Sequence, residues 1–203
     1  ADSDCAYGFH DEIDLSTLVP LIAKPSSPGN VVPVSEVEGG DIYQAYIGSS
    51  ANPGWRDFAV VSDIVRGKVV PPAVSFDVNP SSRQTLEILI ADGRLGAMVA
   101  AGARIHQAGC NGCIGMGQAP ATGQNSLRTV PRNFPGRSGT REDSVFLCSP
   151  ETAAASALTG KITDPRSLDM PCPQLKYPEK TLVTKTMIDA PPQPGRVAFC
   201  RGG

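Results

Sequence analysis

Apolar positions in the middle of the chain follow two different periods, and this pattern predicts alternating strands and helices. Residues 42–48 form a short apolar, β-rich run that predicts a strand. Residues 55–65 then carry apolar side chains at helical spacing, after an Asn-Pro-Gly turn. The same unit repeats as a strand at 73–78 and a helix at 85–91. Strand–helix alternation is typical of a parallel sheet covered on both faces.

The second half of the chain continues this order. A helix of small residues is expected over 95–103, and strands are expected over 126–130 and 144–148. Ser149-Pro150-Glu151 supplies a capping hydroxyl, a proline at the first helical position and a first-turn carboxylate, so a helix is expected from there to Gly160. The fold class is therefore α/β, as a three-layer α/β/α domain with a mainly parallel sheet.

The two ends of the chain differ from this organised middle. Residues 1–40 contain several turn signals and are expected to be an extended lead-in with little core of its own. Residues 41–164 form the α/β domain. The segment 165–203 contains Pro165, Pro171, Pro173, Pro178, Pro191, Pro192 and Pro194. Proline at this density forbids a long helix, so an extended tail or linker is expected there.

Charge and composition limit the classes of partner. The formal net charge of -2 over 203 residues provides no basic surface for nucleic acid or for an anionic membrane. No window approaches the roughly 18 apolar residues of a membrane span, and the first residues do not resemble a signal peptide. Six cysteines are too sparse for a disulfide scaffold. We therefore expect a cytoplasmic protein whose partner is a protein or a small molecule.

The segment 109–118 places Cys110 and Cys113 in a turn made largely of glycine. Glycine allows backbone N–H groups to approach sulfur or an anion closely. A zinc site would need four ligands, and only His10 and His106 are available as imidazoles. A dithiol redox pair is a second possibility. Thiolates that hold an iron–sulfur cluster are the third, because the sulfides of a cluster accept hydrogen bonds from backbone N–H groups.

Several blocks around this turn identify a family resemblance. The blocks are 21–25, 30–34, 47–49, 110–118, 126–129, 132–140 and 149–153. Their order and spacing resemble the third domain of the aconitase superfamily, the aconitate hydratase-like proteins, followed by the linker toward the fourth, swivelling domain. The resemblance implies that the chain is one piece of a larger enzyme, whose remaining domains are its partners.

The resemblance also implies a cofactor. Members of the family carry a [4Fe-4S] cluster on three cysteines, and its open iron acts as a Lewis acid on the hydroxyl of the substrate. Cys110 and Cys113 match two of the three ligands, and Asn52 matches a supporting residue beside the third. His10 and His106 match no catalytic position of the family, and we expect them to be solvated or structural.

The third ligand position is occupied by Ser50, which departs from the family pattern. A serine oxygen is a harder donor than the thiolates that iron–sulfur clusters select. The chain could lack a stable cluster, could hold a labile one with oxygen ligation, or could supply another thiol. The remaining thiols are Cys5, Cys148, Cys172 and Cys200. Cys148 follows an apolar run and is expected to be a small core residue.

Arg132 and Arg137 match the positions at which the family contacts its substrate. Guanidinium groups bind carboxylates through paired hydrogen bonds, and the substrates are di- or tricarboxylates. Pro131 replaces the usual asparagine before the first arginine. The resemblance assigns no catalytic acid or base to this chain, since those residues lie largely in other domains.

The expected function is that of a fragment of a [4Fe-4S] hydro-lyase, which reversibly dehydrates a citrate-like hydroxy-tricarboxylate and is inactive alone. One alternative is an enzyme of the homoaconitase or isopropylmalate isomerase type. Another is a cluster-free binding or assembly module that kept the fold and lost one ligand at Ser50.

Overall fold

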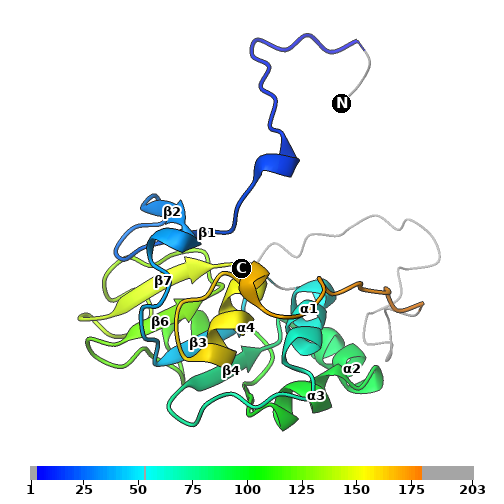
Figure 1. Cartoon of the computed structure of the whole chain (residues 1–203), viewed down its shortest axis with the longest axis vertical. Coiled ribbons are helices and arrows are strands. Elements are labelled where there is room, and N and C mark those ends of the chain that lie inside the picture. The colour runs from blue at the N-terminus through cyan, green and yellow to red at the C-terminus, as the bar shows by residue number, and fades with distance from the viewer. Residues whose placement is uncertain (1–3, 53, 180–203) are drawn as a thin grey trace, which may run out of the picture.

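The computed structural model describes residues 4–52 and 54–179. Its centre is a mixed, mostly parallel sheet in the order β2-β1-β7-β6-β3-β4-β5. The strands are β1 (Leu21–Ala23), β2 (Val31–Pro33), β3 (Gln44–Gly48), β4 (Ser75–Asn79), β5 (Arg104–Ile105), β6 (Asn125–Arg128) and β7 (Ser144–Cys148). The five strands from β7 to β5 are parallel, and β1 pairs antiparallel with both β7 and β2 (Figure 1). The predicted α/β class and mainly parallel sheet are confirmed.

Four α-helices among the described residues connect and cover these strands. They are α1 (Trp55–Val65), α2 (Arg83–Ala91), α3 (Arg94–Ala100) and α4 (Pro150–Thr159). Ser82 caps α2 and Ser149 caps α4, each by accepting a hydrogen bond from the backbone N–H three residues later. Helix α4 ends at Gly160 in the left-handed conformation, as predicted. Helix α3 ends earlier than the predicted 103, before Gly102, which has a φ of 105°.

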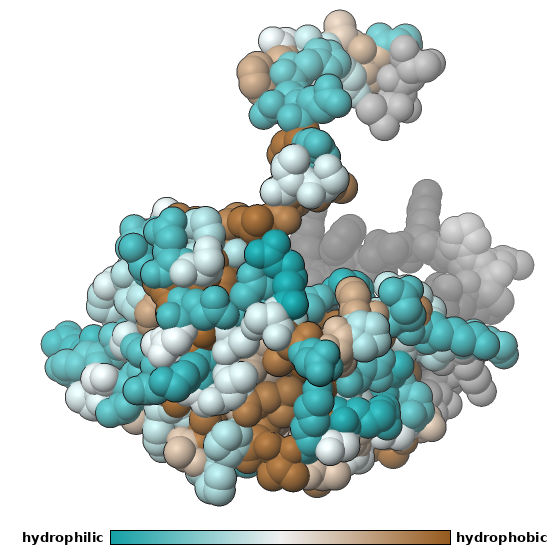
Figure 2. Space-filling view, viewed as in Figure 1, coloured by the Kyte–Doolittle hydropathy of each residue, from teal (hydrophilic) through white to brown (hydrophobic). Residues whose placement is uncertain are grey.

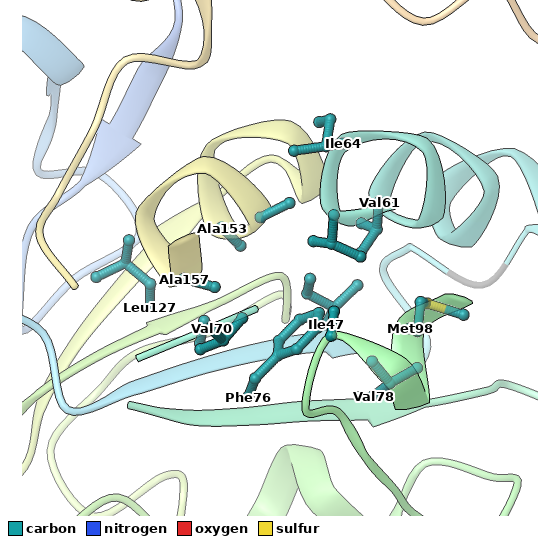
Figure 3. Packing of buried hydrophobic residues seen from close by; sticks show 14 of the residues in the cluster. Ile47, Val61, Ile64, Val70, Phe76, Val78, Met98, Leu127, Ala153 and Ala157 are labelled. Atoms are coloured by element: carbon teal, nitrogen blue, oxygen red, sulfur yellow. The ribbon is translucent and has the colours of Figure 1, made fainter. Parts of the chain in front are cut away.

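The helices share a continuous apolar core with one face of the sheet. Ile47 of β3 and Phe76 of β4 point toward the layer formed by α1 and α4 (Figure 3). Val61 of α1 is fully buried there, as are the alanines of α4 at 153 and 157. Small side chains on α4 allow it to approach both α1 and the sheet closely, so this layer is tightly packed.

The opposite face of the sheet is buried but polar. The fully buried polar or tyrosine side chains on it are Gln44, Tyr46, Asp77, Asn79, Ser126 and Arg128. The segment 106–120, which contains the short 3-10 helix η3 (Asn111–Ile114), covers this face. The second covering layer is thus built from this glycine-rich segment rather than from α-helices, because a polar sheet face needs partners that hydrogen-bond to it.

The lead-in and the tail each contribute side chains to the core of the domain. Strands β1 and β2 lie within the expected lead-in 1–40, and Ile22 and Val34 are buried in the main core. Residues 4–19 form an exposed arm that leaves the domain (Figure 1). In the tail, Leu168 and Met170 pack against the main core, and the one described helical turn is η4 (Pro165–Ser167). The prolines 191, 192 and 194 of the expected linker lie outside the described residues.

No helix in the described part of the chain is both long enough and apolar enough to cross a membrane.

Candidate functional site

The predicted site residues gather at the carboxyl edge of the parallel strands. From β3 the chain proceeds to β4 and β5 on one side, and it returns to β6 on the other side of β3. The boundary between β3 and β6 is therefore the topological switch point of the sheet, where α/β proteins form ligand sites. Ser49 and Ser50 follow β3 at this point, and Thr129 follows β6.

Two hydrogen bonds close the edge between β3 and β6. The backbone N–H of Gly48 donates to Thr129 Oγ1 at 2.9 Å, and Asn52 Nδ2 donates to the carbonyl of Thr129 at 2.8 Å. A Cβ on Gly48 would lie 2.1 Å from the carbonyl oxygen of Asn79, so only glycine fits there. Asn52 thus connects the loop that carries Ser50 to the neighbouring strand.

The turn with both thiols lies against Tyr46 of β3. Cys113, on η3, is buried, whereas Cys110 immediately precedes η3 and is exposed. A Cβ on Gly112 would meet the hydroxyl oxygen of Tyr46 at 2.2 Å. The glycine between the thiols therefore allows the turn to approach the sheet closely, as its composition predicted.

The first thiol is surrounded by hydroxyl groups. Ser49 Oγ lies 3.2 Å from Cys110 Sγ. Hydrogen bonds from Ser49, and then from the hydroxyl and backbone N–H of Ser50, lower the pKa of Cys110 below its ordinary value. Ser49 is fully buried and has a φ of 71°, a left-handed conformation that is unusual for a serine. The fold thus brings Ser50 beside Cys110, although the two are far apart in sequence.

The two predicted substrate arginines occupy different surroundings. Arg137 is partly buried, and its Nη2 lies 3.5 Å from Cys113 Sγ while its Nη1 donates to the carbonyl of Cys113 at 3.3 Å. Arg132 is exposed and makes no hydrogen bond or ion pair with any described residue. A guanidinium group without a protein partner is available to a carboxylate ligand.

Comparison with known proteins agrees with this geometry. Residues 35–160 match the aconitase (aconitate hydratase) family. This chain belongs to the aconitase family. It is 46% identical over 167 residues to the 3-isopropylmalate dehydratase large subunit 1 of Methanopyrus kandleri, which covers 81% of this chain and 40% of that protein. It is 39% identical over 170 residues to the homoaconitase large subunit of Thermus thermophilus, covering 83% of this chain and 40% of that subunit. The chain thus spans about two fifths of the length of these relatives.

The donor set of this aconitase-family chain is one thiol short of a three-cysteine cluster site. Ser50, Cys110 and Cys113 converge, yet Ser50 provides an oxygen. No group of three or more His, Cys, Asp or Glu side chains that could hold a metal ion is present among the described residues. Cys5 lies in the exposed arm and Cys172 in the tail. The described residues therefore fit two ligand positions of a [4Fe-4S] cluster and do not fit the third.

The remaining thiols include one in the sheet and one in the undescribed tail. Cys148 ends β7 and packs against the main core, and burial raises the pKa of its thiol above the ordinary value. The expected core residue is thus partly buried, at the margin of the core. Cys200 lies outside the described residues.

A buried polar network beneath the thiol turn was not predicted from sequence. Arg128 is fully buried and donates to Ser126 Oγ, to the carbonyl of Gly112 at 3.0 Å, to Gln44 Oε1 at 2.8 Å and to the carbonyl of Gln118. Burial lowers its pKa to about 10. The strands of an ordinary parallel sheet are apolar on both faces. In this strand Ser126 and Arg128 alternate with apolar residues, and that alternation is the signal in the sequence.

Proposed function

We propose that this chain is the thiol-bearing portion of an aconitase-family hydro-lyase that acts on a hydroxy-di- or tricarboxylate. The observation that carries the proposal is the position of Arg137 beside Cys113, at a switch point that also bears Ser50 and Cys110. Relatives named 3-isopropylmalate dehydratase and homoaconitase support the alternative of an isopropylmalate isomerase or homoaconitase type of enzyme over the citrate-like substrate first expected.

Within this proposal, the chain supplies recognition of the substrate's carboxylates. Arg132 makes no hydrogen bond with any residue of the described part of the chain, so it can bind one carboxylate through two N–H groups. Arg137 is already held by Cys113, which fixes its position and leaves its outer donors for a ligand. Asn52 supports the loop of Ser50 through Thr129. The acid and base of the dehydration lie in the remaining domains of the parent enzyme, so the isolated chain is inactive.

A second candidate function is a cluster-free binding or assembly module, and Ser50 is the observation that favours it. The serine hydroxyl lowers the pKa of Cys110, so at this position the chain stabilises the thiolate of Cys110 and does not add another thiolate. Such a module would keep the fold and the carboxylate-binding edge without the cluster.

Iron and acid-labile sulfide per chain, measured after anaerobic reconstitution, test these two functions. The unaltered chain is compared with Ser50→Cys, and Ser50→Ala is the control without any donor at the third position. A cluster in the unaltered chain and in Ser50→Cys, but not in Ser50→Ala, supports the hydro-lyase with oxygen ligation. A cluster in Ser50→Cys alone favours the module. The same content in all three variants would show that position 50 is not a ligand position.

A further inference from the structure

The described end of the tail runs along α1 and returns toward the site. Met170 lies just beyond the carboxyl-terminal end of this helix, where its Sδ accepts a hydrogen bond from Lys68 Nζ at 3.3 Å. Tyr177 lies at the other end, with its ring centre 5.2 Å from that of Trp55, the first residue of α1. The tail therefore follows the helix from its end back to its beginning (Figure 1).

Side-chain packing alone holds this part of the tail. Residues 171–179 form no hydrogen bond or ion pair with any described residue outside that segment. Pro173 and Leu175 are half-buried, and Leu175 packs against the main core. Between residues 168–173 and Ile64 of α1 is a largely apolar pocket of about 490 Å³. A segment with few buried contacts and no backbone hydrogen bonds to its surroundings opens at low free-energy cost, so the tail can detach while the domain stays folded.

Trp55 is held from several directions. Its Nε1 donates to Asp92 Oδ2 at 2.6 Å, and the guanidinium carbon of Arg94 lies 5.1 Å from the centre of its ring. Tyr177 adds a third contact, which comes from the tail rather than from the junction of α2 and α3. Tyr177 is itself 65% exposed, so its ring serves as a cover for the indole rather than as a core side chain.

The site loop, residues 49–52, is fixed between two anchors. On the side of the sheet, Asn52 donates a hydrogen bond to the carbonyl of Thr129 at 2.8 Å. On the side of the helices, Trp55 begins α1 only three residues after Asn52. Because this connection is so short, a displacement of the Trp55 ring moves the start of α1 and is passed to the loop that carries Ser50.

We propose that Trp55 and Tyr177 form a clasp, through which docking of the tail positions the site loop. Tyr177 acts through Trp55 and is therefore a positioning residue. With the clasp closed, Ser50 is held beside Cys110. With the tail detached, the indole loses its cover and the loop opens more often. The coupling is reciprocal, so a ligand that orders the loop also favours the docked tail. The clasp goes beyond the proposed function and is the same for the hydro-lyase and for the cluster-free module.

Trp55 is the single tryptophan of the 203-residue chain, so its fluorescence reports the clasp directly. Tyr177→Ala should shift the emission of Trp55 to longer wavelength and increase its quenching by acrylamide. Tyr177→Phe keeps the ring and should retain the original spectrum. Tyr7→Ala is the matched control, because Tyr7 is an exposed tyrosine in the arm, with 52% of its surface accessible. An unchanged spectrum in Tyr177→Ala, or an equal change in Tyr7→Ala, would show that the clasp does not form.

Amide hydrogen exchange, followed by nuclear magnetic resonance, tests whether the clasp positions the loop. The N–H of Gly48 donates to Thr129 Oγ1, and that of Ser49 donates to the carbonyl of Asn79 at 3.2 Å, so both amides report opening of the loop. An aromatic pair shifts an opening equilibrium by about threefold to tenfold, and these two amides should exchange faster by that factor in Tyr177→Ala. The amides of β6 should keep their rates in every variant, which separates opening of the loop from a loss of global stability.

Unchanged exchange of both amides in a variant whose fluorescence has shifted would refute the positioning role. Equal acceleration throughout the sheet, or in Tyr177→Phe, would refute it as well. Neither measurement depends on iron or on turnover, so its failure leaves the hydro-lyase proposal intact.

Discussion

Ser49 links the end of β3 to the chemistry of the first thiol. Its φ of 71° directs the chain away from the strand, and its buried hydroxyl lies 3.2 Å from Cys110 Sγ. Backbone strain of this kind persists where the surrounding structure fixes it, and it is frequent at functional sites. The hydrogen bond from Ser49 is the largest influence that lowers the pKa of Cys110.

Ser49→Gly should raise the pKa of Cys110 toward its ordinary value. The substitution removes the hydroxyl, and glycine accepts the left-handed conformation without cost. A thiol with a higher pKa needs a higher pH to reach the same fraction of thiolate, so alkylation of Cys110 should begin at higher pH. Mass spectrometry of iron-free protein treated with iodoacetamide across pH measures this midpoint. The exposed Cys172 is the internal control. An unchanged midpoint for Cys110 would mean that Ser50 alone stabilises the thiolate.

Both thiols and Ser50 could be assigned to one expected site from the sequence because their motifs are local. The spacing of Cys110 and Cys113 is visible in four consecutive residues, and Ser50 belongs to a short block. The pairing of His106 with Asp77 could not be read in the same way. These two residues are 29 positions apart, and they meet only because β4 and β5 are neighbours in the sheet. Polar partners in a parallel sheet depend on strand order, which apolar periodicity does not reveal.

At the scale of elements, the polar face of the sheet holds the thiol segment in place through Arg128. This side chain extends from β6 under the turn, where it reaches the carbonyls of Gly112 and Gln118, and its guanidinium lies 4.8 Å from the centre of the Tyr46 ring. A buried guanidinium is costly to desolvate, and here it is compensated by acceptors from three different segments. Without it, the carbonyl of Gln118 would lose its donor among the described residues. The carbonyl of Gly112 would keep the N–H of Gly115, and Gln44 Oε1 would keep the hydroxyl of Ser126.

Arg128→Met should therefore destabilise the protein, by about 3 kcal/mol or more in the free energy of unfolding. The reason is that the buried carbonyl of Gln118 would lose its donor, and the carbonyl of Gly112 and the amide oxygen of Gln44 would each lose a charged one. Arg132→Met removes the same charge from an exposed site and should change stability by about 0.5 kcal/mol or less. Urea denaturation of both variants provides the comparison. Equal stability of the two variants would show that the network does not hold the turn.

The predicted elements differ from the structure mainly where strands are very short. The boundaries of α1, β7 and α4 follow their sequence signals closely, because each has a full period of apolar residues or a capping sequence. Strand β5 has two residues, and β1 and β2 have three each. Runs of this length contain no measurable period, so their strand character comes from pairing with neighbours already in place.

At the scale of the whole molecule, the domain and the arm before it differ in how they place their apolar side chains. The domain has a large buried apolar core, whereas the arm exposes Phe9, Ile13 and Leu15, with Phe9 80% exposed. Figure 2 shows apolar residues along the arm where it leaves the domain. The hydrogen bonds of residues 4–19 are formed within the arm itself. Apolar side chains exposed in a row mark a surface that contacts another protein region, in line with the prediction that the remaining domains of the parent enzyme are partners.

Removal of residues 1–14 should leave the free energy of unfolding of the domain within about 0.5 kcal/mol of its original value, because the described residues among them, 4–14, are all exposed. Removal of residues 1–24 is the contrasting variant. It deletes β1, which pairs with β7 and buries Ile22, and it should cost about 3 kcal/mol or more. Urea denaturation followed by circular dichroism measures both. The shorter deletion should also reduce self-association in analytical ultracentrifugation, since it removes the exposed Phe9 and Ile13. A large loss of stability on removing residues 1–14 would instead mean that the arm packs against its own domain.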